Sequence, residues 1–460
     1  MANVLRPQLT KAQAVEYSAA NVLRCTGVAG DETVDPWCPW LDEFMAGQVV
    51  CDPDYIGTPE LGLADVVNQA VTECAGPDRI YIGLEPGEYK GPVFIPQITW
   101  QGRAVPVTIY GMDADPSRTK ISANVDAEMP GEEYQDRFAG LFTGHAPEII
   151  AIFDRISAHS KITTANTSVV RVENDGCQLR NMTLVNTYNA DRLPQGADDS
   201  GATRADFQQS TGQHQAVALL VAGADQVHCE NLHLESFQDT LYLKSPAPFT
   251  TSRSYFKGCK IAGDVDFIFG QTTAYFTDCT IVSRGSRALH AWVAAPSTNI
   301  RTSFGFVFSA CTFAHDGSEN ALAGRFSLGR QWFESVRATP YGVPSVLDYT
   351  CDLDHVSEYN EPNGTISRAT LEAVGKCVIL RSKIGAHINP AAPWDDWNGG
   401  TFGRDGEYTP GVWNARFRPV QFRAADVTSA LSDWLPAQPV DLSDVSPDTV
   451  FLAEFDNQEI

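Results

Sequence analysis

Two aspartates set into apolar segments are the side chains of this sequence best suited to catalysis. Asp266 lies in Gly263–Gly270 (GDVDFIFG), and Asp239 lies in Gln238–Leu241 (QDTL). A carboxylate beside so much apolar surface costs free energy unless it is hydrogen-bonded or paired. A lone aspartate of this kind more often accepts backbone N–H bonds at a turn. Two of them, followed by Arg330, could instead supply the nucleophile and the proton donor of an ester hydrolysis.

The apolar residues of Gly263–Gly270 predict a strand. Residues two apart share a face of a strand. Asp264 and Asp266 would therefore point one way, while Val265 and Phe267 would point into the core.

Four short motifs occur in order over residues 215–332. They are Gln215–Leu219 (QAVAL), Gln238–Leu241 (QDTL), Asp266–Gly270 (DFIFG) and Leu328–Trp332 (LGRQW). The chain thereby resembles the pectinesterase family of pectin methylesterases, whose signatures read roughly QAVAL, QDTL, DFIFG and LGRPW. The first three signatures are intact, and Gln331 stands where proline is usual.

A further family motif, GxYxE, is incomplete because Gly87–Gly91 (GEYKG) lacks the final glutamate. This change, with the long segment that follows, resembles a branch of the family that includes outer-membrane lipoproteins. Some members of that branch have lost the catalytic residues, whereas the catalytic motifs are present here.

The resemblance implies a role for each polar residue of the motifs. Asp266 would be the nucleophile, held ionised by Arg330, whose planar guanidinium suits bidentate pairing. Asp239 would protonate the leaving alcohol and then activate water, which requires it to be protonated while Asp266 is ionised. Gln238 and Gln215 would donate N–H groups to the tetrahedral oxyanion. In isolation, either glutamine would be interpreted as a turn or ladder amide.

Aromatic residues near these motifs are the candidates for sugar binding. Phe269 and Trp332 match positions at which the family stacks sugar rings. Tyr242 and Trp292 are weaker candidates, because either could belong to the core or to the rim. The resemblance implies no metal and no cofactor, and no Cys/His spacing resembles a zinc site.

The stretch between Asp239 and Asp266 is longer than the family commonly shows. The extra residues fall around Lys244–Arg253, which contains two prolines. We expect a longer turn between coils that leaves both aspartates on neighbouring strands. A slip of one residue would instead turn the two carboxylates to opposite faces.

Short β-prone units recur between about residues 168 and 313, each alternating a polar or small residue with an apolar one. Such repeats, with no helical period between them, indicate a solenoid. We therefore predict an all-β protein with a right-handed parallel β-helix, the fold that the resemblance also implies. Its inward ladder, with the cysteines as small buried hydrophobes, would contain Met182, Leu232, Cys259, Cys279 and Cys311.

The rest of the chain is predicted to frame this solenoid. Residues 1–60 would form an N-terminal extension with Cys-containing loops and one helix near residues 10–23. Residues 61–423 would form the β-helix, and residues 424–460 an acidic tail packed on the body. Apolar residues at helical spacing within residues 61–76 predict a helix that caps the first coil.

Three polar segments are predicted to leave the solenoid as excursions, at residues 111–165, 188–213 and 335–375. Long loops inside compact proteins are usually functional or disordered. The second of them directly precedes Gln215, so we expect it to form a wall of the binding cleft. Near the first coil, residues 79–96 are expected to read strand, turn, strand, with the turn at residues 86–89.

Eleven cysteines are many for a cytoplasmic enzyme. Four of them lie in the N-terminal region: Cys25, Cys38, Cys51 and Cys74. Their clustering predicts disulfides in an oxidising compartment, with three pairings possible. Cys351 and Cys377 flank a polar insertion and could close it. The odd count leaves at least one free thiol unless an intermolecular bridge forms.

The charge of −24 over 460 residues argues against nucleic acid as a partner and disfavours anionic membrane surfaces. No apolar run reaches the 18 residues typical of a transmembrane helix. Residues 1–30 lack the layout of a signal peptide. Either the protein is cytoplasmic or the numbering begins after a removed leader. The predicted location is secreted or in the cell envelope, periplasmic or at the outer membrane.

The predicted function is de-esterification of methylated homogalacturonan, or of oligogalacturonides, to carboxylate and methanol by a monomer. An acidic protein should prefer methylated stretches, because the substrate gains negative charge as it reacts. One alternative is another β-helix polysaccharide enzyme, a glycoside hydrolase or a calcium-dependent lyase, but neither explains Gln215, Gln238 and Arg330 together. The other is a repurposed or non-catalytic envelope protein that binds glycans or hydrolyses other esters or thioesters.

Overall fold

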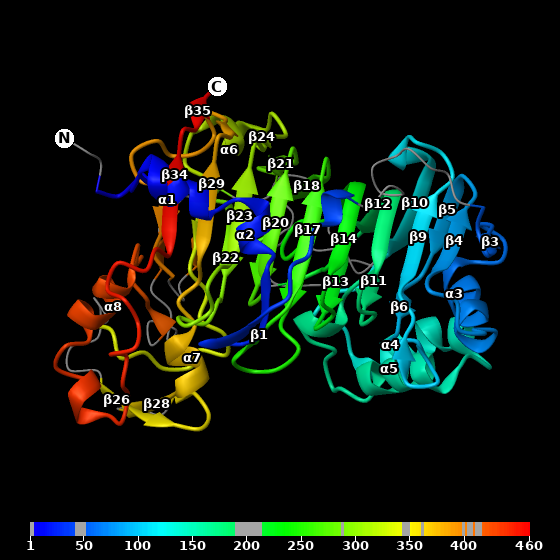
Figure 1. Ribbon diagram of the computed structural model, residues 1–460, viewed down its shortest axis with the longest axis horizontal. Helices are drawn as coiled ribbons and strands as arrows, with labels where there is room; N and C mark the ends of the chain where they lie inside the picture. The colour runs from blue at the N-terminus through cyan, green and yellow to red at the C-terminus, as the bar shows by residue number, and fades with distance from the viewer. Residues whose placement is uncertain are drawn as a thin grey trace.

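The chain winds into a stack of parallel coils. Successive coils add strands to two long sheets, one of 17 strands and one of 8. Figure 1 shows the stack running along the long axis of the molecule, from β3 and β4 at one end to β34 at the other. The predicted parallel β-helix is confirmed. The computed structural model describes residues 4–41, 52–188, 214–286, 289–342, 350–359, 363–397, 401–402, 408–409 and 416–460.

The 8-stranded sheet carries the four sequence motifs, and the 17-stranded sheet forms the rest of the coil wall. The strands of the 8-stranded sheet are β6 (Val93–Ile95), β11 (Val170–Val172), β13 (Leu219–Ala222), β15 (Leu241–Lys244), β19 (Ile268–Gly270), β22 (Trp292–Pro296), β25 (Ser327–Arg330) and β31 (Trp394–Asp395). Those of the larger sheet are β3 (Tyr55–Gly57), β4 (Ile80–Leu84), β5 (Gly87–Lys90), β9 (Val107–Gly111), β10 (Thr119–Ala123), β12 (Gln178–Asn186), β14 (Val227–Glu235), β17 (Arg253–Lys257), β18 (Lys260–Gly263), β20 (Thr273–Thr277), β21 (Thr280–Ser283), β23 (Phe306–Ser309), β24 (Thr312–His315), β29 (Cys377–Leu380), β30 (Lys383–Ile384), β34 (Leu452–Phe455) and β35 (Gln458–Glu459).

The larger sheet bends at a corner where most coils pass through a left-handed backbone conformation. Few residues other than glycine adopt this conformation, so its recurrence at register-matched positions marks one structural corner. The residues there, with φ between 47° and 61°, are Asn181, Asn231, Gly258, Asp278, Ala310, Arg381 and Asp456.

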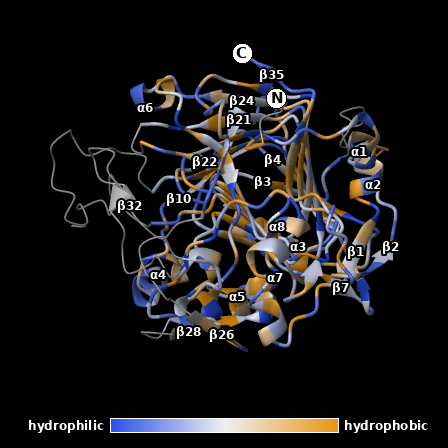
Figure 2. Ribbon diagram, turned by 90° about the vertical axis from the view of Figure 1, so that its left-hand side faces the viewer, coloured by the Kyte–Doolittle hydropathy of each residue, from blue (hydrophilic) through white to orange (hydrophobic). Residues whose placement is uncertain are grey.

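The inward ladder predicted from the repeats is confirmed by the strand register. Its members lie next to one another on β12, on β14 and immediately before β18, β21 and β24. Each is at most 1% exposed. Burial raises the pKa of the Cys279 thiol well above its usual value, so this cysteine packs as a small hydrophobe. Figure 2 shows apolar residues on the strands that enclose the core.

The prediction of a single helix near residues 10–23 is wrong. The structure has two short helices there, α1 (Lys11–Glu16) and α2 (Ala19–Val22). Thr10 begins the first with a capping box, and the extended backbone of Ser18 separates the two. A β-hairpin of β1 (Cys25–Val28) and β2 (Asp31–Val34) follows.

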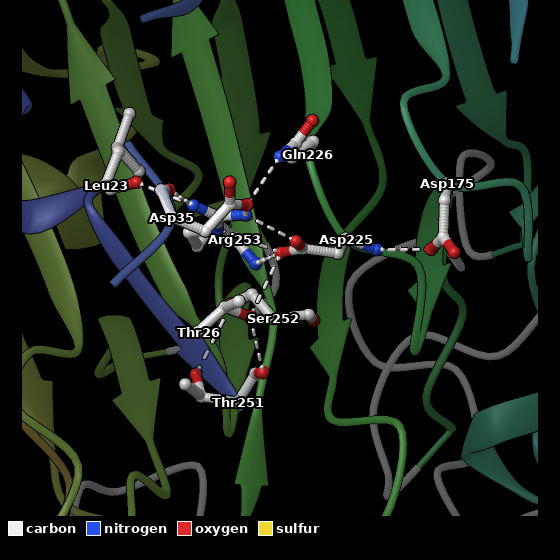
Figure 3. A network of polar contacts seen from close by, with 9 residues as sticks. All are labelled: Leu23, Thr26, Asp35, Asp175, Asp225, Gln226, Thr251, Ser252 and Arg253. Carbon is white, nitrogen blue, oxygen red and sulfur yellow. Dashed lines mark hydrogen bonds and ion pairs between the residues drawn. The ribbon is translucent and has the colours of Figure 1, made fainter. Parts of the chain in front are cut away.

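This hairpin docks on the extra residues that separate the two predicted catalytic aspartates. β16 (Thr250–Thr251) pairs antiparallel with β1, and the adjoining Arg253 is fully buried. Arg253 donates to the carboxylates of Asp35 and Asp225, each at 2.6 Å (Figure 3). The longer turn therefore anchors the N-terminal extension.

A helix lies within residues 61–76, as predicted. It is α3 (Leu63–Thr72), which contacts β3, β4 and β6 and buries Leu63, Val66, Val67 and Ala70. That it caps the solenoid stays a prediction. The turn expected at residues 86–89 is wrong, because β5 occupies Gly87–Lys90 and pairs with β10.

Two of the three predicted excursions contain regular structure. Residues 111–165 include β10, which belongs to the larger sheet, followed by α4 (Gly131–Phe138) and α5 (Pro147–Ser157). Residues 335–375 include a separate sheet of β26 (Thr350–Asp354), β27 (Glu358–Tyr359) and β28 (Asn363–Ser367), followed by α7 (Arg368–Glu372). The cleft wall expected at 188–213 falls almost wholly outside the described residues.

The C-terminal tail extends the solenoid. After α8 (Ala424–Ala430), β34 pairs in parallel with β29, and β35 pairs with β30. Residues 424–460 therefore supply strands to the larger sheet in addition to packing on the body.

All ten cysteines in the described ranges are free thiols. Cys25, Cys38 and Cys74 form no disulfide with one another, and Cys51 lies outside those ranges. Cys351 and Cys377 are likewise unpaired, so they do not close the insertion between them. None of the described helices is long and apolar enough to cross a membrane.

Candidate active site

The two candidate catalytic aspartates lie at equivalent turns that lead into the 8-stranded sheet. Asp239 comes two residues before β15, and Asp266 comes two residues before β19. Both have a left-handed backbone, with φ of 67° and 50°, and both are 7% exposed. Such a backbone is uncommon for residues other than glycine, and strained residues cluster at functional sites.

The prediction that Gly263–Gly270 forms one strand is wrong. β18 ends and β19 begins within it, so its middle turns the chain from one sheet to the other. Asp264 is fully buried, whereas Val265 is only half-buried and lies outside the core. The left-handed backbone of Asp266 breaks the alternation that would have put both carboxylates on one face.

The strand register keeps Asp239 and Asp266 at matching positions of neighbouring coils. Leu241 pairs with Ile268 in the parallel ladder of β15 and β19, and each follows its aspartate by two residues. The Asp239 N–H donates to the carbonyl of Val265 at 3.1 Å, which extends the match into the turn. The extra residues after β15 therefore cause no slip.

Arg330 forms a bidentate ion pair with Asp266. Its Nε donates to Oδ1 at 2.9 Å and its Nη2 donates to Oδ2 at 2.8 Å. Each side chain is 10% exposed. Since arginine stays protonated, this pairing places a positive charge against the Asp266 carboxylate and fixes its orientation.

Two indole rings lie against the same guanidinium. The Arg330 Cζ is 3.9 Å from the ring centroid of Trp292 and 4.6 Å from that of Trp397. The Trp292 Nε1–H donates to Asp395 Oδ2 at 2.9 Å. Neither Trp397 nor Asp395 was predicted to belong to the site, although the aromatic segment PWDDW carries both.

The two candidate oxyanion donors lie on neighbouring coils. Gln238 directly precedes Asp239 and is 4% exposed, and its carbonyl accepts the N–H of Ala216 at 3.1 Å. Gln215 comes just before Ala216 and is half-buried, and its carbonyl accepts the N–H of Ala127 at 2.9 Å. The backbone at both glutamines is thus fixed, while their role as donors stays a prediction.

Three of the four predicted sugar-binding residues form one aromatic cluster. The rings of Tyr242 and Phe269 stack with centroids 4.2 Å apart, and Trp332 meets Phe269 edge to face at 5.8 Å. Their strand neighbours Leu241 and Ile268 belong to the main core, whereas Tyr242 and Phe269 belong to a separate cluster. Since side chains alternate along a strand, this cluster lies on the outer face of the 8-stranded sheet.

Glu334 adjoins the aromatic cluster and was not predicted. Burial raises the pKa of its carboxyl, against the opposing effects of the Lys244 charge and a hydrogen bond from Gln271. Burial also raises the pKa of the Tyr242 phenol, with a contribution from the Glu334 charge. The only sequence signal that could have identified Glu334 is its position two residues after the LGRQW motif.

The two departures from the family motifs have local structural explanations. Gln331, in place of proline, is 1% exposed, donates to the Gly375 carbonyl at 3.1 Å and accepts the N–H of Gln421 at 2.8 Å. Gly91, in place of glutamate, has a φ of 102°, and a Cβ there would lie 2.3 Å from the Leu141 side chain. A glutamate at this position would require Leu141 to move.

Comparison with known proteins identifies the family of the chain. A family model described as Pectinesterase matches residues 135–340. The sequence is 30% identical over 398 residues to a pectinesterase of Ralstonia solanacearum, a match that covers 85% of this chain and 84% of that protein. It is 29% identical over 354 residues to pectinesterase B of Dickeya dadantii, covering 74% and 76%. The chain belongs to the pectinesterase family, whose members are carboxylic ester hydrolases.

A solved structure supports the fold. Rice weevil pectin methyl esterase superimposes with a TM-score of 0.66 and 23% sequence identity, covering 100% of this chain and 98% of that one. The β-helix is therefore that of known pectin methylesterases.

Proposed function

We propose that this protein hydrolyses the methyl esters of homogalacturonan, as polymer or as oligogalacturonides, to carboxylate and methanol. The observation that carries the proposal is the bidentate pair between Arg330 and Asp266, with Asp239 at the matching position of the preceding coil. This arrangement supplies an oriented carboxylate beside a second, mostly buried carboxyl group.

In the first half of the reaction, an Asp266 oxygen attacks the ester carbonyl carbon. The N–H groups of Gln238 and Gln215 donate to the resulting oxyanion. Asp239 then gives its proton to the departing methoxy oxygen, so that methanol leaves and an acyl anhydride joins the substrate to Asp266.

In the second half, water cleaves the anhydride. The Asp239 carboxylate takes a proton from the water while the water oxygen attacks the substrate acyl carbon. The bond to Asp266 then breaks, and its carboxylate returns to Arg330. The galacturonic acid leaves and ionises in solution, and Asp239 is again protonated. One water is consumed and one methanol released per ester, with no metal or cofactor.

The sugar chain is proposed to lie against the aromatic cluster of Phe269, Tyr242 and Trp332 beside the aspartates. Trp332 is the most accessible ring of this cluster, because Phe269 and Tyr242 are each 4% exposed. Trp292, the fourth candidate, lies against Arg330. The protein is proposed to act as a secreted or envelope monomer. Its three proposed parts are an extension at 1–60, the solenoid at 61–423 and a tail at 424–460, and β3, β34 and β35 of the two flanking parts add strands to the larger sheet.

Methanol release from highly methylated pectin, with chain length monitored, tests the proposal. We expect methanol from the wild type with unchanged chain length, and none from Asp266→Ala or from Asp266→Asn, which keeps the size of the side chain. Near-normal activity of pure Asp266→Ala would show that the nucleophile is wrong. Chain shortening without methanol would indicate a different polysaccharide enzyme.

A second candidate function is hydrolysis of a different ester or thioester. The observation that favours it is the glycine at position 91, where a Cβ would lie 2.3 Å from the Leu141 side chain. If the wild type releases no methanol from polymer or from methylated oligogalacturonides, a screen of other esters and thioesters would distinguish this candidate from a non-catalytic glycan-binding protein.

A further inference from the structure

The Arg330 guanidinium contacts two indole rings in addition to Asp266. Two of its nitrogens donate to the Asp266 carboxylate, and its Cζ lies 3.9 Å from the ring centroid of Trp292 and 4.6 Å from that of Trp397. A guanidinium shielded from water by aromatic rings gains more from them than an exposed one. The rings also limit the rotamers that Arg330 can adopt.

The two indoles are themselves fixed by the last coils of the solenoid. Trp292 is 5% exposed, and its N–H donates to Asp395, whose other oxygen accepts the N–H of Asp396 at 2.8 Å. The backbone N–H of Trp397 donates to the carbonyl of Arg418 at 2.9 Å, and the N–H of Arg418 donates to the carbonyl of Trp397 at 2.8 Å. Chain segments more than a hundred residues from Asp266 therefore determine where its partner lies.

We propose that Trp292, Trp397 and Asp395 are positioning residues that hold Arg330 in the orientation at which it fixes the Asp266 carboxylate. The proposal rests on the proposed role of Asp266 as the nucleophile. It gives Trp292 a role different from sugar stacking, because its ring lies against the guanidinium and its N–H is bonded to Asp395.

Other charged groups also surround this assembly. Asp264 adjoins Asp266 in the same turn, and Asp239 lies on the preceding coil. His290 stacks on Trp292 at 6.3 Å, and burial lowers its pKa against the opposing charge of Asp395. Since a neighbouring cation favours an ionised carboxylate, loosening Arg330 should move the acid limb of kcat/KM to higher pH.

The test compares Trp292→Leu, Trp397→Leu, Trp292→Phe and Asp395→Asn with wild type in methanol release. We expect kcat to fall about 10-fold in the two leucine variants, the size of one buried cation–π contact. KM should stay within about twofold, and the acid limb should shift upward. Trp292→Phe keeps a ring over Arg330 and should lose less activity than Trp292→Leu.

Trp434→Leu is the matched control. Trp434 is also partly buried, and its indole N–H donates to the carbonyl of Cys351 at 3.2 Å rather than to a residue beside Arg330. The substitution should lower the melting temperature without moving the acid limb of the pH profile of kcat/KM. The position of the limb does not depend on the fraction of active enzyme, so partial misfolding cannot imitate the expected shift.

Two results would overturn the inference while leaving the proposed function intact. One is a raised KM with unchanged kcat in Trp292→Leu, which would make Trp292 a sugar contact. The other is a wild-type acid limb in both leucine variants. Methanol release that survives in Asp266→Ala would instead remove Asp266 as the nucleophile, and a wild type that releases no methanol would overturn the proposed function itself.

Discussion

Replacing Arg330 with leucine tests the ion pair at the centre of the candidate site. Arg330 donates two hydrogen bonds to Asp266, and each side chain is 10% exposed. Removing one partner of a buried pair leaves the other charge uncompensated, at a cost of about 3–5 kcal/mol. We therefore expect Arg330→Leu to lower the free energy of unfolding by about 3–4 kcal/mol.

The double variant should be less destabilised than the single replacements imply. Asp266→Leu leaves Arg330 with its two indole contacts, so we expect a smaller loss of about 2 kcal/mol. Removing both charges from a buried pair is often close to neutral. Because the two single losses together amount to about 5–6 kcal/mol and the double variant should be nearly neutral, the double-mutant cycle should then give a coupling free energy of about 5 kcal/mol.

Urea unfolding followed by circular dichroism supplies the four free energies, provided that the urea dependence is the same in each variant. The exposed pair Arg103 and Asp78, with side-chain exposures of 48% and 105%, is the control and should couple by less than about 1 kcal/mol. A coupling between Arg330 and Asp266 as small as that of the control would refute the reasoning from burial and bidentate geometry.

Three further predictions concern catalysis, the N-terminal extension and acid stability. Gln238→Ala should lower kcat about 10²–10³-fold and Asp239→Asn about 10²–10⁴-fold in the methanol assay, and wild-type rates in either variant would remove that residue from the mechanism. Arg253→Met should lower the free energy of unfolding by about 3 kcal/mol and expose the N-terminal hairpin to proteases, because two carboxylates lose their partner, while methanol release per folded molecule stays within about twofold. Burial lowers the pKa of His387 from 6.5 to about 4, so the unfolded chain binds a proton more readily than the folded one between these values. The contribution of neutral His387 to the free energy of unfolding should be fully present above pH 6.5 and should fall by roughly 3 kcal/mol as the pH drops toward 4. His387→Phe should remove this part of the pH dependence of urea unfolding.

The catalytic motifs and the repeats could be recognised from sequence because both are local patterns. The alternation around Met182 and Cys259 shows which side chains point inward, and a stack of coils converts equal positions into a ladder. Short-range geometry was harder to predict. Asp264 and Asp266 were expected on one strand face, and the left-handed backbone of Asp266 decided otherwise.

Two segments without a clear sequence pattern nevertheless form strands, because pairing with strands distant in sequence stabilises them. β10 lies in a segment predicted to be an excursion, and it forms because β5 and β12 flank it in the sheet. β34 lies in the C-terminal tail and pairs with β29, the strand of the preceding coil. A strand of four or five residues carries too little pattern of its own to predict such a partner.

The sequence by itself determined which residues could do chemistry, because their types and order are local properties of Asp239, Asp266 and Arg330. The tertiary structure decided whether they meet. The loop after β15 could have shifted the register, and it does not, because its extra residues pair with the N-terminal hairpin outside the 8-stranded sheet. The indoles around Arg330 come from different coils, and only closure of the solenoid brings them together.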